Sequence, residues 1–376
     1  GYFNGRESIK ITSRAQSTEQ LVKTVVAISL IELSILLTKK SNTVLMAALS
    51  NFSTTIGNLA EFIYLYIKYK KYKKEINEEI LFSVNTEKIR LLSIIKEIMK
   101  YAMPISLSAI IMSISRSIDS VTIVNDLKDI LGYEVAKKEY GILSGKVDTL
   151  INFPLSFGMA ISGALLPTIA MYKDNLKLKE DRINKSILIE MLIAIPVSLI
   201  YCFYSNEILS ILFPNASNGG VLLRISSFSI IFLILEGVMT TILNGIGRIY
   251  VPIKATFIGA IVKLILNKIL IKNVNFIFGG TRGAALATLI CHVVTCLILI
   301  LEVRKTAKIK IHIKKDFKVL IATAAIMLLS KIMCLELSKY LPIKIGLIIS
   351  FIISAIIFII TILKLKIIEK INLKLL

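Results

Sequence analysis

The chain of 376 residues is poor in the side chains that most enzymes use for chemistry. It has no tryptophan, four cysteines, and only two histidines, His292 and His312. A zinc site of the H-E-x-x-H type is excluded because it needs two histidines four residues apart. No two cysteines have the C-x-x-C spacing of a redox or metal site, so they are interpreted as small hydrophobic residues. We therefore expect no catalytic residue, no metal site and no resident cofactor.

Charged residues are also scarce, at 19% of the chain against about 25% in soluble proteins. Hydrophobic residues reach 55%, and the mean hydropathy is +0.76. The apolar residues come in ten blocks of roughly 18 to 25 residues, the length that crosses about 30 Å of hydrocarbon. Lipid offers no hydrogen-bond partner to free backbone groups, so such blocks have to be helices. The sequence predicts an all-α integral membrane protein with spans near residues 13–38, 44–67, 101–124, 141–172, 187–204, 221–243, 250–271, 283–303, 319–337 and 343–363.

Lysine and arginine are distributed unequally between the two ends of these spans. Of 46 such residues, 30 lie in segments on the side of the N-terminus and 11 on the other side. The positive-inside rule therefore places both termini in the cytoplasm. The basic run KYKKYKK at 68–74 directly follows a span. We interpret it as a topology signal that meets anionic headgroups of the membrane lipids, and we expect no nucleic acid as a partner.

Five basic residues lie inside the predicted spans, where a charge costs at least about 2.5–3.5 kcal/mol on insertion scales and usually faces a bundle interior or a water-filled cavity. They are Lys23, Arg116, Lys146, Lys263 and Lys331.

In the span 101–124, helical spacing places Arg116 beside Asp119, on a face with three serines, Ser106, Ser113 and Ser120. The opposite stripe is apolar and suits lipid, with Ile111, Ile114, Ile118 and Val121. Two roles stay open for Asp119. In the first role it pairs with Arg116, and this pair either serves helix packing or lasts until a substrate displaces it. In the second role it binds a coupling ion, H⁺ or Na⁺.

The span 13–38 begins with a second polar group, in which Gln16, Glu19, Gln20 and Lys23 follow the i, i+3, i+4, i+7 spacing of one helix face. This face is either an amphipathic lead-in at the cytoplasmic surface or part of a cavity. Lys146 and Asp148 lie near the outer end of the span 141–172 and are expected to line its mouth. Gly145-Lys146 lacks the other residues of a phosphate-binding loop. His292, among apolar neighbours, is interpreted as a packed core residue.

A weak internal repeat relates the two ends of the chain. A shift of 240 positions aligns Asn4-Gly5 with Asn244-Gly245, and "LVK" ending at Lys23 with "IVK" ending at Lys263. It pairs the first predicted span with the seventh. A six-helix repeat is typical of transporters built from two equivalent halves, with the substrate site between them.

Several segments carry short motifs in a fixed order. Residues 1–25 carry G-Y-F-x-G followed by an E-Q pair, residues 101–124 carry A-x-P-I and an internal Asp, and residues 140–170 carry Y-G-x-L-x-G and an internal Pro. These segments resemble the stage V sporulation protein B and polysaccharide-transporter family. "VKLILNKILI" and "RGAALATLI" resemble the eleventh and twelfth helices of the family. The resemblance covers most of residues 1–305 in order. It implies the multidrug, oligosaccharidyl-lipid and polysaccharide (MATE-like) exporter superfamily.

The resemblance also implies a domain organisation. The lipid II flippase branch has fourteen helices in a two-lobed bundle, of which this chain would hold the fifth to the fourteenth, about ten, with about four missing from the front. Residues 1–67 would be the last two helices of the N-terminal lobe and 68–100 a basic cytoplasmic linker. Residues 101–303 would form the six-helix C-terminal lobe, and 304–376 two additional helices with a basic tail.

The function implied is a flippase for a polyprenyl-pyrophosphate-linked oligosaccharide or peptidoglycan precursor, acting by alternating access in spore cortex or cell envelope synthesis. We expect a monomeric transporter in the bacterial cell membrane. Basic residues at Lys23, Arg116, Lys146 and Lys263 would replace the water around the pyrophosphate. The alternative is an ion-coupled exporter of drugs or small cations, in which acidic residues matter more. A membrane enzyme is disfavoured, because the largest non-cytoplasmic loop, 125–140, has only about 16 residues.

Overall fold

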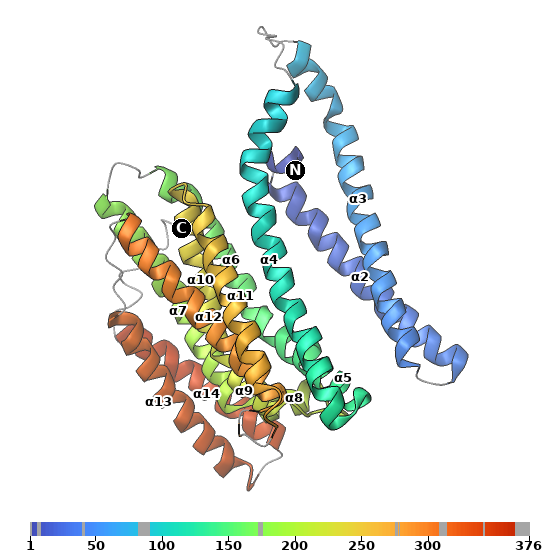
Figure 1. Ribbon diagram of the computed structural model, residues 1–376, viewed down its shortest axis with the longest axis vertical. Helices are drawn as coiled ribbons and strands as arrows, with labels where there is room; N and C mark the ends of the chain where they lie inside the picture. The colour runs from blue at the N-terminus through green and yellow to red at the C-terminus, as the bar shows by residue number, and fades with distance from the viewer. Residues whose placement is uncertain are drawn as a thin grey trace. The chain divides into compact units, whose positions relative to one another are not determined.

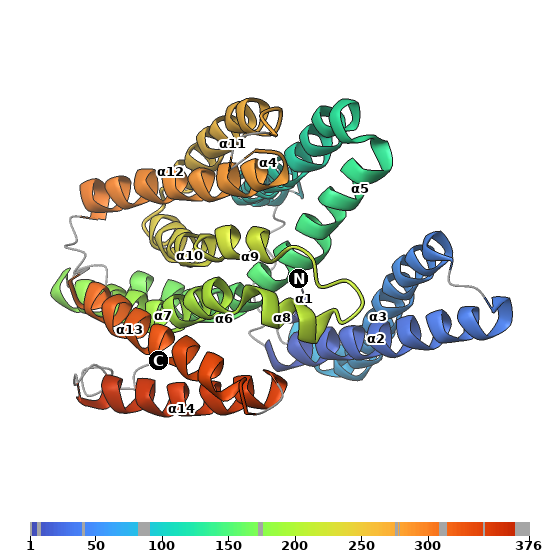
Figure 2. The same cartoon turned by 90° about the horizontal axis from the view of Figure 1, so that it is seen from below.

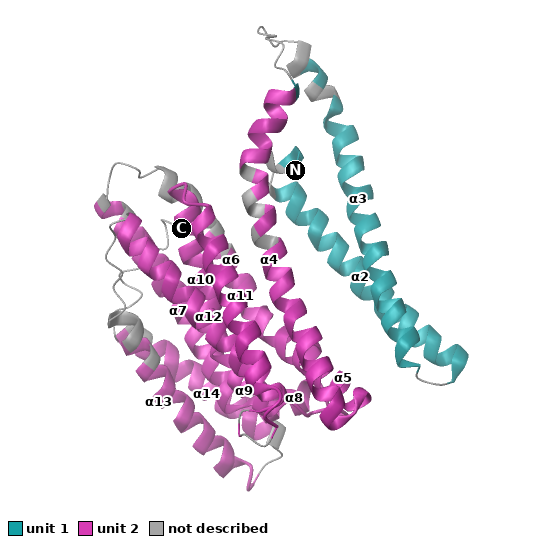
Figure 3. Cartoon of the chain, viewed as in Figure 1, with its two compact units in different colours: residues 1–91 teal, residues 92–376 magenta. Residues whose placement is uncertain are grey.

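The computed structural model describes residues 2–5, 9–39, 42–81, 91–171, 176–274, 277, 279–307, 314–340 and 343–364, and the regular elements in these ranges are helices (Figure 1). The chain divides into two compact units, Gly1–Leu91 and Leu92–Leu376, which are described separately (Figure 3). The first contains α1 (Tyr2–Gly5), α2 (Ile9–Thr38) and α3 (Thr43–Leu81).

The second unit contains the remaining elements. They are α4 (Leu91–Leu131), α5 (Tyr133–Gly141), the π-helix η1 (Ile142–Val147), α6 (Asp148–Met171), α7 (Leu176–Phe203), α8 (Ser205–Leu212), α9 (Gly220–Ser227), α10 (Ser229–Gly245), α11 (Tyr250–Leu270), α12 (Thr281–Ala307), α13 (Lys314–Leu337) and α14 (Ile343–Lys364). Among the described residues, each predicted apolar block is helical apart from an end residue in some blocks and Phe228, a turn residue between α9 and α10 within the block 221–243. The prediction of helices over these blocks is therefore confirmed.

Four helical segments among the described residues are long and apolar enough to cross a membrane. They are Lys10–Thr38, Glu180–Phe203, Gly220–Gly245 and Thr281–Thr306, and Ile345–Thr361 is a shorter apolar helix. In α14, isoleucines remain exposed on the outside of the bundle, Ile348, Ile352 and Ile356 among them. Exposed apolar surface of this kind is expected of a helix that faces lipid.

In the first unit, α2 and α3 pack against each other as a helical hairpin. Asn42 caps the start of α3, since its Oδ1 accepts hydrogen bonds from the backbone N–H groups of Val44 at 3.1 Å and Leu45 at 3.3 Å. The two helices approach closely at Gly57, where an added Cβ would lie 3.0 Å from the Cβ of Lys23. A small residue at this contact is typical of helix packing in membranes.

The predicted linker 68–100 is largely helical where it is described. α3 continues to Leu81, and α4 begins at Leu91. Residues 82–90 lie outside the described residues. The boundary between the two units falls within the predicted linker.

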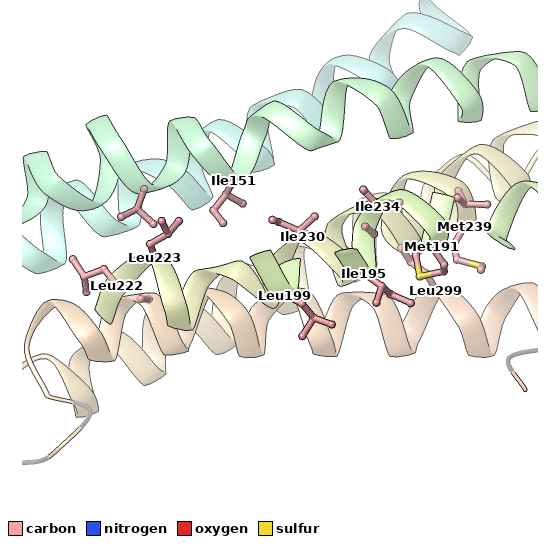
Figure 4. Close-up of a cluster of buried hydrophobic side chains, with 14 of the residues drawn as sticks. Ile151, Met191, Ile195, Leu199, Leu222, Leu223, Ile230, Ile234, Met239 and Leu299 are labelled. Atoms are coloured by element: carbon pink, nitrogen blue, oxygen red, sulfur yellow. The ribbon is translucent and has the colours of Figure 1, made fainter. Parts of the chain in front are cut away.

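The core of the second unit is built from α6, α7, α9, α10, α12 and α13. On α7, Met191, Ile195 and Leu199 follow a four-residue spacing, so they share one face and meet Ile230 and Ile234 of α10 (Figure 4). Seen from below, α13 lies against α7 and α14 against α13, whereas α11 and α12 lie together beyond α10 (Figure 2).

Two glycines fix the geometry around α11. Gly247 has φ 80° and ends α10 in a Schellman motif, with hydrogen bonds from Arg248 N to Leu243 O at 2.8 Å and from Gly247 N to Asn244 O at 3.0 Å. Gly259 lies where α11 meets α12, and an added Cβ would lie 2.2 Å from Thr295 Oγ1. This close contact sets the position of α11, and with it the position of the buried polar residues described next.

Candidate functional site

A buried ion pair joins α4 to α11. Lys263 Nζ lies 2.6 Å from Asp119 Oδ2, and only 3% of Lys263 and 7% of Asp119 are exposed. Lys263 Nζ also donates a hydrogen bond to the backbone oxygen of Ser115 at 3.1 Å. Each charge is therefore neutralised inside the bundle. Removing one partner of such a pair typically costs about 3–5 kcal/mol, because the other charge is left buried and uncompensated.

Asn267, one turn after Lys263 on α11, completes the contact. Its Nδ2 donates hydrogen bonds to Asp119 Oδ1 and to Thr122 Oγ1, both at 2.9 Å. The four side chains come from an i, i+3 pair on α4 and an i, i+4 pair on α11, so both pairs share a helix face. Both oxygens of Asp119 are thus bonded to α11. Sequence reasoning selected Asp119 and Lys263 but missed Asn267 and Thr122, whose only signal is this spacing.

Arg116 lies on a different face of α4. It is exposed, and it forms no hydrogen bond or ion pair with any residue that the structure describes. The predicted pairing of Arg116 with Asp119 is therefore wrong in this structure. Three residues along a helix turn the side chain by about 60°, which is enough to direct Asp119 to α11 while Arg116 stays outside the contact.

The rest of the α4 surface follows the prediction only in part. Ser113 and Ser117 are exposed beside Arg116, and Ser117 Oγ donates to Ser113 O at 3.0 Å. Ile114 and Val121 are exposed, as a lipid-facing stripe requires. Ile111 is buried instead, at 8% exposure. The predicted apolar, lipid-facing stripe is therefore wrong at Ile111, because spacing within one helix carries no information about its neighbours.

Asp148, at the start of α6, belongs to the electrostatic surroundings of the ion pair. Its carboxyl lies within Coulombic range of Asp119, Lys263, Arg116 and His292. Lys146 of η1, which the sequence places with Asp148 at the mouth of the span 141–172, forms contacts elsewhere. Lys146 Nζ donates hydrogen bonds to Ala216 O and, at 2.8 Å, to Asn218 Oδ1 in the loop after α8. The structure thus separates the two residues.

A second polar pair joins α10 to α12. His292 Nδ1 lies 3.1 Å from Glu236 Oε1, and both side chains are half-buried. The interpretation of His292 as a packed core residue stays a prediction, and the structure adds a carboxylate partner to its ring. The sequence signal was Glu236 itself, a single acid in an otherwise apolar segment.

The predicted residues of the first unit lie along the contact between α2 and α3. Glu19 and Lys23 are partly buried, and both approach Gly57 of α3. Gln20 is exposed, and its Nε2 donates a hydrogen bond to Glu19 Oε1 at 3.3 Å. Within this unit, Glu19 and Lys23 therefore take part in helix packing. Across the described part of the chain, no three His, Cys, Asp or Glu side chains gather as a metal site.

Comparison with protein families gives one match that covers most of the chain. The sequence profile of the family described as lipid II flippase MurJ matches residues 21–356. Stage V sporulation protein B of Bacillus subtilis is 26% identical over 322 residues, which are 84% of this chain and 59% of that protein. Lipid II flippase MurJ of Bacillus subtilis is 25% identical over 343 residues, 89% of this chain and 60% of that protein.

A further sequence relative and a solved structure are also similar to this chain. An uncharacterized membrane protein of Methanocaldococcus jannaschii, MJ1375, is 29% identical over 247 residues, 65% of this chain and 55% of that protein. A solved structure of lipid II flippase MurJ in an inward closed conformation superposes with a TM-score of 0.60 at 15% identity, covering 93% of this chain and 66% of that one. At this identity the superposition shows the fold. The chain spans about three fifths of the length of the two Bacillus relatives.

Proposed function

Since the chain belongs to the lipid II flippase MurJ family, we propose that it moves a polyprenyl-pyrophosphate-linked oligosaccharide or peptidoglycan precursor across the membrane by alternating access. The similarity to stage V sporulation protein B and to MurJ supports spore cortex or cell envelope synthesis as the setting. Transport rather than catalysis is the activity proposed. The family and the apolar helices make the chain a multi-pass protein of the bacterial membrane, and the lysine and arginine distribution supports cytoplasmic termini.

The observation that carries the proposal is that Arg116, exposed on α4, forms no ion pair or hydrogen bond with any residue that the structure describes. Asp119 is the nearest acid along α4, and Lys263 already neutralises it at 2.6 Å. Arg116 is exposed and free of ion pairs with described residues, so its guanidinium is available to an anion. A guanidinium presents a planar fork of donors that matches phosphate oxygens. We assign Arg116 to the pyrophosphate of the substrate.

Lys263 and Asn267 then act as positioning residues for the site. By holding both oxygens of Asp119, they keep this carboxylate from pairing with Arg116 or repelling a phosphate. Lys23 is proposed as a further cation for the substrate, because the internal repeat aligns it with Lys263. Glu19 and Gln20 lie on the same helix face as Lys23. Lys146, bonded to the loop after α8, serves the outer mouth and not the phosphate contact.

A coupling cation, H⁺ or Na⁺, is part of the proposal, and a monomer suffices for it. The carboxyl of Asp148, in the same neighbourhood, forms no ion pair or hydrogen bond with the residues that the structure describes. The competing function, export of small cations, would rely on acidic groups near Arg116. Asp119 is bonded to α11 through both oxygens, which leaves Asp148 as the acid of this neighbourhood that could serve such a function. We favour anion transport because of the exposed guanidinium of Arg116 and the family of the chain.

The experiment is translocation of a labelled undecaprenyl-pyrophosphate-linked precursor in vesicles that contain the purified chain. We expect Arg116→Ala to lower the rate at least about tenfold, since a charge-assisted hydrogen bond contributes about 1.5–3 kcal/mol. Arg116→Lys should keep part of the rate, because the charge remains but the fork is lost. Ser117→Ala, a neighbouring exposed position, is the matched control. A normal rate in well-expressed Arg116→Ala protein would contradict the phosphate role.

A further inference from the structure

A second carboxyl group is buried far along the chain from the Asp119 and Lys263 pair. Glu190 lies near the middle of α7, and its exposed fraction is 0%. It belongs to Glu180–Phe203, one of the segments long and apolar enough to cross a membrane. Met191, the next residue, lies in the apolar cluster with Ile234 of α10 (Figure 4). Glu190 is therefore a titratable group at the centre of a membrane-length helix.

The hydrogen bonding of Glu190 is incomplete. Ser162 of α6 donates its hydroxyl to Glu190 Oε1 at 2.9 Å, and Ser162 is itself 5% exposed. Glu190 Oε2 is buried and has no hydrogen-bond partner in the described part of the chain. Gly237 of α10 lies beside this serine, since an added Cβ would lie 3.8 Å from Ser162 Oγ. Among the described residues, the neutral hydroxyl of Ser162 is thus the one hydrogen-bond donor to this carboxyl.

No described cation compensates a charge at Glu190. The other charged residues of α7 lie in its first part. The last of them is Lys185, which pairs with Asp181. Of the charged groups on the helices packed against α7, Glu207 pairs with Lys331, and Glu236 pairs with His292. The other described charged groups on these helices are Asp148 on α6, Arg224 on α9, and Lys318 and Glu336 on α13, and none of them forms an ion pair with Glu190.

These contacts favour a neutral carboxyl. An ionised carboxylate without a cation in a dry interior is strongly disfavoured, whereas the protonated acid is an ordinary buried polar group. We propose that Glu190, hydrogen-bonded to Ser162, is a proton-binding site of the helix bundle, occupied when α6, α7 and α10 are packed as in this structure and vacated only when they separate or admit water.

A proton bound here would link packing to pH. Loss of the proton leaves a charge that needs water, so it favours separation of α6 from α7, and rebinding favours closure. If the chain transports as proposed above, Glu190 makes H⁺ the coupling ion. The protonation itself does not depend on what the protein transports.

The test of protonation is infrared spectroscopy of the purified full chain in nanodiscs at neutral pH. We expect Glu190→Gln to remove one carbonyl band of a protonated carboxylic acid. Glu336→Gln, at an exposed acid paired with Lys339, should remove carboxylate absorption instead. Loss of carboxylate absorption in Glu190→Gln, with every acid band kept, would overturn the proposal.

If Glu190→Gln does not fold, Ser162→Ala is the variant in which the protonation of Glu190 is measured. This variant retains the carboxyl and removes its one donor, so the acid band should move to higher wavenumber. An unshifted acid band would show that the buried acid is not Glu190.

Coupling of transport to the proton on Glu190 is measured separately, in vesicles that transport the labelled precursor. With wild type, an imposed pH gradient should change the rate, and with Glu190→Gln the ratio of rates with and without the gradient should fall to one. A retained gradient effect would reject coupling at Glu190, while the infrared result would still decide the proton site. Absence of transport by the wild type would instead count against the proposed function.

Discussion

At the scale of single residues, the buried charges of this protein differ in how they are compensated. Lys263 and Asp119 neutralise each other, and Glu190 has only a serine hydroxyl. Arg116 stays exposed on α4. The same rule of membrane energetics applies to all of them, because a charge inside a bundle has to be paired, protonated or given to a ligand. Lys263 and Asp119 show the first outcome, and we propose the second for Glu190 and the third for Arg116.

The Asp119 and Lys263 pair allows a prediction about stability. Lys263→Met and Asp119→Asn should each lower the free energy of unfolding by about 3–5 kcal/mol, because each leaves one buried charge alone. The double variant should recover most of this loss, since no charge remains. Thermal unfolding of the detergent-solubilised chain measures all three.

Lys339→Met is the control for this comparison. Its ion pair with Glu336 is exposed, so the change should stay within about 1 kcal/mol. The double variant could instead lose as much unfolding free energy as the two single variants together. This result would mean that the two charges do not compensate each other.

Sequence reasoning identified the charges but not their partners. Arg116, Asp119 and Lys263 stand out because ions are rare in apolar spans. Pairing depends on which helices are neighbours, and hydropathy carries no information about that. Spacing within α4 therefore suggested Arg116 as the partner of Asp119, whereas the packing of α11 against α4 decided for Lys263. Glu190 could have been found by the same rule, as a single acid in the middle of an apolar span.

At the scale of elements, helix positions were predictable because the length of an apolar run is fixed by the bilayer. Their contacts depend on small residues. Gly259 lets α11 approach Thr295 and Cys291 of α12, and Gly57 lets α3 approach α2. Such glycines are visible in the sequence. The helix that each of them contacts becomes evident only in the folded chain.

Gly259→Ala should therefore destabilise the chain, by about 1–3 kcal/mol, as is usual for an overpacked contact. The added Cβ would meet Thr295 Oγ1 at 2.2 Å, so adding Thr295→Ala should restore part of the stability. Gly141→Ala is the matched control, because an added Cβ there meets no atom within 4 Å. Equal melting temperatures for Gly259→Ala and Gly141→Ala would contradict the close contact.

At the scale of the whole molecule, the distribution of basic residues predicts the orientation in the membrane. Lys71 of α3 lies in a segment assigned to the cytoplasm, and Lys137 of α5 lies in the loop assigned to the opposite side. Both side chains are exposed, so both positions suit chemical labelling.

In a background without Cys202, Cys291, Cys296 and Cys334, a membrane-impermeant maleimide should label Lys137→Cys in intact cells. Lys71→Cys should react only after the membrane is permeabilised, and this reaction controls for reactivity. Labelling of Lys71→Cys in intact cells, with protection of Lys137→Cys, would reverse the predicted orientation.

The ion pair between α4 and α11 has a further consequence for energised membranes. Moving one elementary charge through the full field costs about 2.3 kcal/mol per 100 mV. Lys263 and Asp119, held 2.6 Å apart, carry no net charge when they move together. A joint displacement of α4 and α11 would thus draw no work from the membrane voltage through this pair. The charge of Arg116, together with the phosphate that we propose it binds, would set how strongly voltage acts on that displacement.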